Sequence, residues 1–159
     1  GYRLPTESEW SWVAKVTKAG STKVFPWNSP SYPPPFVSGN YADESAKSML
    51  PFTISNYNDS FPVSASVGSF RPNEKGIFNL SGNVAEWVND FYEIRVNKSE
   101  PLVDYRGPNT GNRHVIRGAS WALGSRSELR LSYREPGNNG KIDVGFRIAR
   151  YVDKPKGDL

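Results

Sequence analysis

The sequence predicts a loop-rich α+β fold with one or two helices and several short antiparallel strands. A segment near the N-terminus combines a helix cap with apolar residues at helical spacing, and two segments near the C-terminus alternate apolar and polar residues as half-buried strands do. The 14 Gly and 13 Pro interrupt the rest of the chain and favour irregular structure. The 159 residues are enough for one domain with a hydrophobic core and too few for two.

The helix is predicted over residues 6–19. Thr6 and Glu9 form a Thr-x-x-Glu capping box, in which the Thr hydroxyl accepts a hydrogen bond from the Glu backbone N–H and the carboxylate bonds back to the Thr N–H. The apolar side chains that would face the core, at spacings of three and four residues, are Trp10, Val13 and Ala14. Gly20 is the expected end of the helix.

Five short strands are expected after the helix, at residues 23–27, 66–70, 114–121, 129–134 and 144–149. In the last two, apolar side chains are expected to form one buried face: Leu129, Leu131, Tyr133, Val144, Phe146 and Ile148. Residues 28–35 are too rich in proline for a helix or a central strand, so a loop is expected there.

The composition excludes several kinds of chemistry. Without cysteine the chain has no disulfide, thiolate nucleophile, zinc ribbon or iron–sulfur cluster. The single histidine, His114, cannot form a histidine cluster for zinc or iron, and a packed or exposed side chain is a better interpretation of it than a Ser-His-Asp triad. No apolar run is long enough for a membrane helix, and the first residues do not form a signal peptide.

The net charge of +4 is concentrated in residues 113–150, where eight Lys and Arg stand against three Asp and Glu. A basic patch of this kind can bind nucleic acid. The arginines alternate with apolar residues, as outward-facing residues of strands do, so exposed strand faces are the preferred interpretation and a nucleic-acid partner is not expected.

Residues 76–92 form the most distinctive stretch, because two Asn, a Gly and a Glu occur together within residues 79–87. Glycine permits bends that aim backbone carbonyls at one point, and Asn and Glu side chains would complete an oxygen cage of the kind that calcium prefers. The alternative is an Asn/Gly turn between two strands, with Glu86 in solvent and Trp87 in the core. The residues alone favour the turn.

A second oxygen-rich stretch lies in residues 39–61, which show no periodicity. They contain no EF-hand pattern of spaced Asp and Asn followed by Gly and Glu. Solvated turns are the better interpretation of these residues, and a cation site assembled from separate segments is the alternative.

Five blocks in order resemble the formylglycine-generating enzyme, or sulfatase-modifying factor, family: Tyr-Arg-Leu-Pro-Thr-Glu-Ser-Glu-Trp at 2–10, Phe-Pro-Trp at 25–27, Gly-Ile-Phe-Asn-Leu-Ser-Gly-Asn-Val-Ala-Glu-Trp at 76–87, Val-Ile-Arg-Gly-Ala-Ser-Trp at 115–121 and Gly-Phe-Arg at 145–147. The resemblance implies a modified C-type lectin-like fold. It places a family domain at residues 1–152, without the N-terminal part of the family domain, and a tail at 153–159.

The resemblance also implies one or two calcium ions. The first site would consist of side-chain oxygens of Asn40 and Asp59 with backbone oxygens of Tyr41 and Phe61. The second would consist of side-chain oxygens of Asn79 and Glu86 with carbonyls near Gly82 and Val84. For residues 76–92 it therefore favours the cage over the turn.

The family's catalytic residues do not carry over. Formylglycine-forming members use copper and two cysteines, and Leu123 and Glu128 stand at the equivalent positions. Neither side chain can hold Cu(I), which selects soft thiolate ligands. The iron-dependent relatives need histidines that this chain lacks, so no copper or iron is expected and no catalytic residue is assigned.

The expected function is therefore a non-catalytic, calcium-stabilised binding or scaffold module in an extracytoplasmic setting. Its partner would be a protein or small ligand at the former substrate groove, for which the candidate residues are Trp121, Arg126, Glu128, Arg130 and Tyr133. A further chain or segment could complete the domain, because missing strands leave an exposed sheet edge. The alternatives are part of a metal-dependent oxidase with its metal ligands in an absent N-terminal segment, and a hypervariable ligand-binding protein diversified within residues 122–144.

Overall fold

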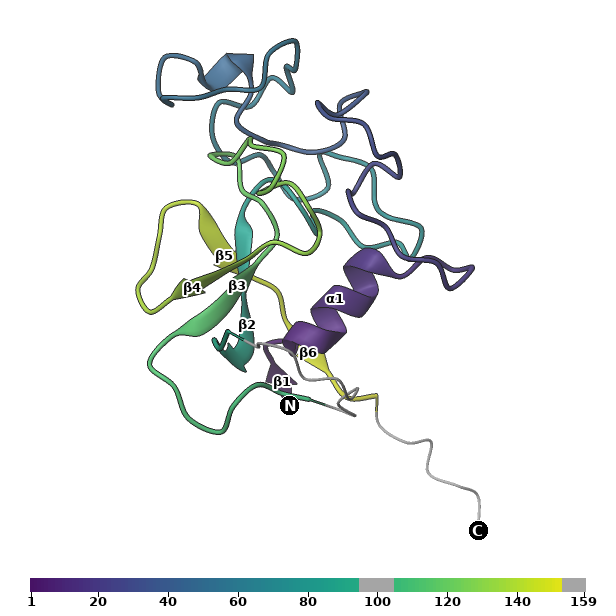
Figure 1. Cartoon of the computed structure of the whole chain (residues 1–159), viewed down its shortest axis with the longest axis vertical. Helices are drawn as coiled ribbons and strands as arrows, with labels where there is room; N and C mark the ends of the chain where they lie inside the picture. The colour runs from purple at the N-terminus through teal and green to yellow at the C-terminus, as the bar shows by residue number, and fades with distance from the viewer. Residues whose placement is uncertain (95–104, 153–159) are drawn as a thin grey trace.

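The computed structural model describes residues 1–94 and 105–152 (Figure 1). Residues 153–159, expected to be a tail, lie outside the described residues. In chain order the elements are β1 (Tyr2–Arg3), α1 (Glu7–Lys15), the 3₁₀ helix η1 (Glu44–Ala46), β2 (Ala85–Phe91), β3 (His114–Arg117), β4 (Arg134–Gly137), β5 (Val144–Phe146) and β6 (Ala149–Arg150). These short elements, separated by long irregular segments, confirm the predicted α+β class.

Four strands form the main sheet in the order β4-β3-β2-β5, and β1 pairs with β6 in a separate two-stranded sheet. The β1–β6, β2–β3 and β3–β4 pairs are antiparallel, as predicted, whereas β2 and β5 are parallel. This difference arises because β4 and β5 lie at opposite edges of the sheet. After β4 the chain crosses the sheet, and β5 then enters beside β2 in the same direction. In Figure 1 the irregular segment between α1 and β2 forms the upper part of the molecule, away from the sheet and helix.

The capping box of α1 is confirmed. The Thr6 hydroxyl accepts a hydrogen bond from the Glu9 backbone N–H at 3.2 Å, and the Thr6 N–H donates to Glu9 Oε2 at 2.8 Å. Trp10 and Ala14 are buried, and Val13 is half-buried, so the predicted apolar stripe does face the core.

The predicted end of the helix at Gly20 is wrong, because α1 ends at Lys15. Val16 is already extended and forms a β-bridge with Thr22. Gly20 instead supplies a φ of 83° in the tight turn that joins these two residues.

Three predicted strands are absent from the described residues. Residues 23–27 and 66–70 form turns and bends, and residues 129–133 form a turn that leads into β4. Leu129 and Leu131 are buried while Arg130 is exposed, so alternating burial was predicted correctly. Turn hydrogen bonds produce that alternation here, which shows that period-two burial does not require a ladder of strand hydrogen bonds.

The predicted buried face of residues 144–149 is also wrong. Phe146 is 68% exposed and Ile148 is 61% exposed. β5 is an edge strand that pairs with β2 on one side only, and no described element covers these two side chains. Gly145 is the residue that faces a neighbour, since a Cβ atom there would lie 3.1 Å from Val84.

Two groups of buried side chains form the core. The aromatic group under the irregular segment consists of Phe25, Trp27, Tyr41, Ile54, Tyr57, Ala119 and Leu129. The group between α1 and the sheet consists of Trp10, Ala14, Leu80, Val88, Val115 and Leu131. Residues 76–92 contribute Leu80 and Val88 to the second group, so this stretch is anchored at both ends of its turn.

Among the described residues, no helix is long and apolar enough to cross a membrane.

Replacing Gly137 by Ala tests the packing of β4. A Cβ atom at Gly137 would lie 2.4 Å from Trp87 and 2.6 Å from Ile116, whereas one at Gly140 would meet no atom within 4 Å. Because an overpacked site must distort, we expect Gly137→Ala to lower the free energy of unfolding by about 1–3 kcal/mol. The Gly140→Ala control should change it by less than about 0.5 kcal/mol. Urea denaturation measures both, and equal stability of the two variants would contradict this packing.

Candidate functional site

The four residues of the first predicted calcium site lie together. Asp59 is buried, its Oδ2 accepts a hydrogen bond from the Tyr41 N–H at 3.0 Å, and its Oδ1 accepts one from the Phe61 N–H at 3.0 Å. These bonds connect two segments that are eighteen residues apart in sequence. In the described parts of the chain, the backbone oxygens of Tyr41 and Phe61 accept no hydrogen bond, so both can act as ligands.

Asn40 has a buried oxygen without a partner. Its Nδ2 donates to the Val63 carbonyl at 2.7 Å and reaches Asn83 Oδ1 at 3.5 Å, which fixes the orientation of the amide. The Oδ1 atom is buried and has no hydrogen-bond partner. A buried acceptor without a donor costs about 1–3 kcal/mol. A cation at this oxygen would remove that cost.

The electrostatics of Asp59 point to the same chemistry. Burial and, to a smaller extent, the nearby Asp43 carboxylate raise the pKa of its carboxyl to about 6, while the two backbone N–H donors oppose the rise. Asp43 is fully buried and accepts the Asp59 N–H at its Oδ2 at 2.6 Å. Among the described residues, no cationic side chain contributes to the pKa of Asp59. The cluster therefore fits a hard cation with oxygen ligands.

Two participants in this cluster were not predicted as site residues. Asn83 clamps Asn40 through its backbone N–H, which donates to the Asn40 carbonyl at 2.8 Å, and through its side chain. Asp43 supplies the second negative charge and caps η1 by accepting the Ser45 N–H at 3.0 Å. Asn83 has a positive φ of 70°, but Asn is common in turns, so the sequence carried no separate signal for its role.

The second predicted site contains the guanidinium of Arg147. Glu86 is buried, and its Oε2 accepts hydrogen bonds from Trp10 Nε1 at 2.7 Å and from Arg147 Nε at 2.6 Å. Arg147 Nη2 bonds to the other carboxylate oxygen and also donates to the carbonyls of Phe78 at 3.1 Å and Asn79 at 3.3 Å. Of the oxygens that the cage would offer to calcium, this single guanidinium thus binds both carboxylate oxygens of Glu86.

This arrangement fits a metal ion less well than the first site does. Three N–H groups use most of the lone pairs of the Glu86 carboxylate, and the Arg147 charge neutralises it. The interpretation that leaves Glu86 in solvent is wrong as well, because its side chain is 6% exposed. Arg147 belongs to the Gly-Phe-Arg block, but its role as the partner of Glu86 was not predicted.

Gly82 and Val84, the predicted carbonyl donors, connect this stretch to its surroundings. Gly82 has a φ of 88°, and a Cβ atom there would lie 2.8 Å from the Asn40 carbonyl oxygen. Only glycine permits this approach, which places the two predicted sites next to each other. Val84 packs against Gly145 of β5.

Of the five predicted groove residues, Arg126 and Arg130 line one hollow, together with Val24, Phe25 and Ser127. The other three do not line it. Trp121 is buried, and its backbone N–H donates to the Asn83 carbonyl at 2.8 Å. Glu128 and Tyr133 are half-buried, and burial raises the pKa of the Tyr133 hydroxyl.

Leu123 and Glu128, which the resemblance places at the positions of the family's cysteines, have structural contacts. Leu123 is half-buried and packs against the aromatic group of the core. Glu128 Oε2 accepts the Ser125 N–H at 2.9 Å and so closes a turn. The His114 ring contacts the Phe91 ring at a tilt of 32°, and in residues 1–94 and 105–152 no three His, Asp or Glu side chains gather as metal ligands.

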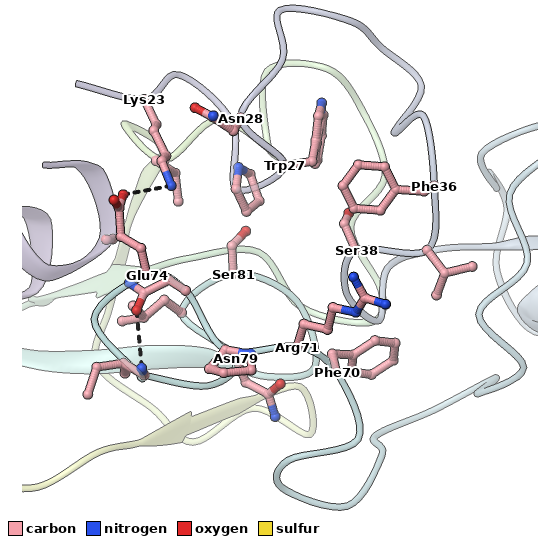
Figure 2. A pocket seen from close by; sticks show the side chains of 18 residues that line it. Lys23, Trp27, Asn28, Phe36, Ser38, Phe70, Arg71, Glu74, Asn79 and Ser81 are labelled. Atoms are coloured by element: carbon pink, nitrogen blue, oxygen red, sulfur yellow. Dashed lines mark hydrogen bonds and ion pairs between the residues drawn. The ribbon is translucent and has the colours of Figure 1, made fainter. Parts of the chain in front are cut away.

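A separate hollow of about 270 Å³ opens between the segments at 23–38 and 70–81, beside the end of α1 (Figure 2). Asn79 lines it, but no predicted groove residue does. Its wall is partly aromatic, with Trp27, Phe36 and Phe70 around the space that Figure 2 shows.

Known proteins are similar to this chain in sequence and in fold. It is 31% identical over 163 residues to a formylglycine-generating enzyme of Streptomyces coelicolor, covering 99% of this chain and 49% of the enzyme. It is 29% identical over 173 residues to the inactive C-alpha-formylglycine-generating enzyme 2 of Mus musculus, covering 100% of this chain and 46% of that protein. The chain thus spans about half the length of these curated relatives.

The structure resembles Treponema denticola variable protein 1 with a TM-score of 0.69 and 28% identity, over 93% of this chain and 47% of that one. It resembles PvdO from Pseudomonas aeruginosa with a TM-score of 0.67 and 25% identity, over 95% of this chain and 53% of that one. These likenesses confirm the C-type lectin-like fold that the five sequence blocks imply. Residues 1–152 match the model of the sulfatase-modifying factor enzyme 1-like domain, and the chain belongs to that family.

Proposed function

We propose that this chain is a non-catalytic binding module whose fold is stabilised by a calcium ion. The observation that carries the proposal is the use of Leu123 and Glu128, which take the positions of the copper-binding cysteines. One packs into the aromatic core and the other closes a turn. Neither side chain is a ligand for Cu(I). The name of the mouse relative, an inactive formylglycine-generating enzyme, is consistent with a family member that does not catalyse this oxidation.

Calcium would bind at the Asn40–Asp59 site. Asp59 would supply the charge, Asn40 its unpartnered oxygen, and Tyr41 and Phe61 their backbone carbonyls. Bound there, the ion would hold together the two ends of the segment from residue 40 to residue 61. We prefer this site to the Asn79–Glu86 cage, where Arg147 already neutralises the carboxylate. An extracytoplasmic setting suits calcium sites of weak to moderate affinity.

Two surfaces of the module suit partners. Exposed Arg126 and Arg130 line a hollow that would accept a protein or a small ligand. Exposed Phe146 and Ile148 at the β5 edge suit a chain or segment that completes the domain, because the relatives are about twice as long as this chain. The likeness to a variable protein favours a second candidate, ligand binding through diversified residues within 122–144.

Metal analysis tests the function directly. Protein that has been incubated with calcium, copper(I) and iron(II) and then desalted is expected to retain about one calcium ion, because hard oxygen ligands are present. Elemental analysis by mass spectrometry gives the stoichiometry. Stoichiometric copper or iron, retained without calcium, would support the oxidase alternative and overturn the proposal.

The pH dependence of stability tests the role of Asp59. Its folded pKa of about 6 exceeds its unfolded value of 3.8, so the folded state keeps a proton that the unfolded state has lost. Without calcium, the stability that protonated Asp59 provides should be present below pH 4 and be lost, by up to about 3 kcal/mol, as the pH rises to 6. Calcium should reverse this trend, raising the Tm more at pH 7.5 than at pH 5.

Thermal unfolding with calcium or EDTA measures both effects. Asp59→Asn should abolish the calcium response and this part of the pH dependence, although loss of one backbone hydrogen bond will also lower its Tm. Glu44→Gln is the matched control, since that exposed carboxylate accepts only the Asn56 N–H from the same segment. A calcium response that survives in Asp59→Asn would place the ion elsewhere.

Arg147→Met tests which cation neutralises Glu86. Removing one partner of a buried ion pair should lower the free energy of unfolding by about 3–5 kcal/mol, because the Glu86 carboxylate is left unpaired. Arg150→Met, which removes an exposed arginine three residues away, should change it by less than about 0.5 kcal/mol. If calcium raises the Tm of Arg147→Met more than that of the unmodified protein, the cage accepts an ion once the guanidinium is gone. Equal losses in the two variants would show that Arg147 is not the essential partner.

A further inference from the structure

The hollow in Figure 2 has a rigid aromatic wall. Trp27 is 4% exposed, stacks on Phe25 with ring centroids 4.6 Å apart, and donates from its Nε1 to the Ser31 carbonyl at 2.9 Å. Its ring is therefore held in place. Phe36 lines the same hollow and is 57% exposed, so much of its ring surface remains able to contact a ligand.

The hollow carries one positive charge without a counter-charge. Lys23 and Glu74 neutralise each other, with Nζ and Oε1 3.0 Å apart. Glu74 also accepts the Lys18 backbone N–H at 3.1 Å, which occupies its other oxygen. Arg71 is exposed at the rim and, within the described chain, forms no hydrogen bond or ion pair.

A further donor in the hollow lacks an acceptor. The Ser81 hydroxyl makes no hydrogen bond with a described residue, and Figure 2 shows it directed into the hollow. The Asn79 amide, whose buried Nδ2 atom has no hydrogen-bond partner, points away from the hollow in Figure 2 and is not counted among its donors. Arg71 and Ser81 together offer N–H and O–H donors to an acceptor that the described residues do not supply.

We infer that this hollow binds a carboxylate attached to a flat apolar group. Arg71 would form a charge-assisted hydrogen bond with the carboxylate, and the Ser81 hydroxyl would donate to another of its lone pairs. Trp27 and Phe36 would hold the apolar group between them. A volume of about 270 Å³ lies near the low end for ligand pockets, about 300–1,000 Å³, so the ligand is of amino-acid size. The inference rests on the proposed binding role but not on the calcium site.

Isothermal titration with N-acetyl-L-phenylalanine and with its uncharged amide tests the inference. The acid should bind at least about tenfold more tightly than the amide, because only the acid gains the ionic hydrogen bond with Arg71. Arg71→Gln should remove this difference by weakening the acid about tenfold and leaving the amide unchanged. Arg150→Gln is the matched control, since that exposed arginine lines neither hollow and should change neither titration.

Phe36→Ala supplies a second variant that should fold normally, because its ring is mostly exposed. It should weaken the acid and the amide alike. Equal affinities for the two ligands, no binding of the acid, or an acid affinity that Arg71→Gln leaves unchanged would each overturn the inference.

The same carboxylate could come from a free aromatic acid or from the C-terminus of a polypeptide that ends in an aromatic residue. The tripeptide N-acetyl-Ala-Ala-Phe with a free C-terminus distinguishes them. Binding as tight as that of the free acid identifies a polypeptide terminus, and binding about tenfold weaker identifies a small molecule. Running each titration with calcium and with EDTA separates this inference from the calcium proposal. Asp59→Asn should abolish the calcium response without changing the contacts to the carboxylate.

Discussion

A buried carboxylate, Glu86, connects the separate parts of this fold. Its oxygens bind Trp10 from α1 and Arg147 from the segment after β5, while its own backbone lies in β2. A charge taken out of water must be paired, so the folded arrangement of Glu86 requires all three segments. The same guanidinium binds two carbonyls of the turn before β2. The turn that positions Gly82 and Asn83 against Asn40 therefore depends on this ion pair.

The two clusters that were expected to hold calcium differ in how the charge of their carboxylates is compensated. At Glu86 the protein supplies its own cation, Arg147. At Asp59 the described residues supply only N–H donors and a second carboxylate, Asp43, which together with burial raises the pKa of Asp59. A metal ion that binds only the folded state of such a cluster would raise its stability. This contrast, rather than the number of oxygens near each site, is why we propose calcium at Asn40 and Asp59.

Two apolar side chains depart from the burial that their pattern predicts. Phe146 and Ile148 alternate with small and polar residues as a strand with a buried face should, yet both are exposed, Phe146 on the edge strand β5 and Ile148 between β5 and β6. An alternating pattern therefore does not by itself decide which side chains are buried. Trp121 shows the opposite: an aromatic side chain expected at a binding surface is needed to fill the interior.

The sequence by itself determined the start of α1, the α+β class and the family, because capping and ordered blocks of residues are local signals. By resemblance it also named eight residues as ligands of two calcium sites, and these remain a prediction. Only the tertiary structure decided where α1 ends, that β5 runs parallel to β2, and that Arg147 fills the Glu86 cage. Residues 76–92 were ambiguous between a turn and a cage for the same reason. Hydrogen bonds between residues about sixty positions apart decide which oxygens remain free, and no local pattern of residues encodes that pairing.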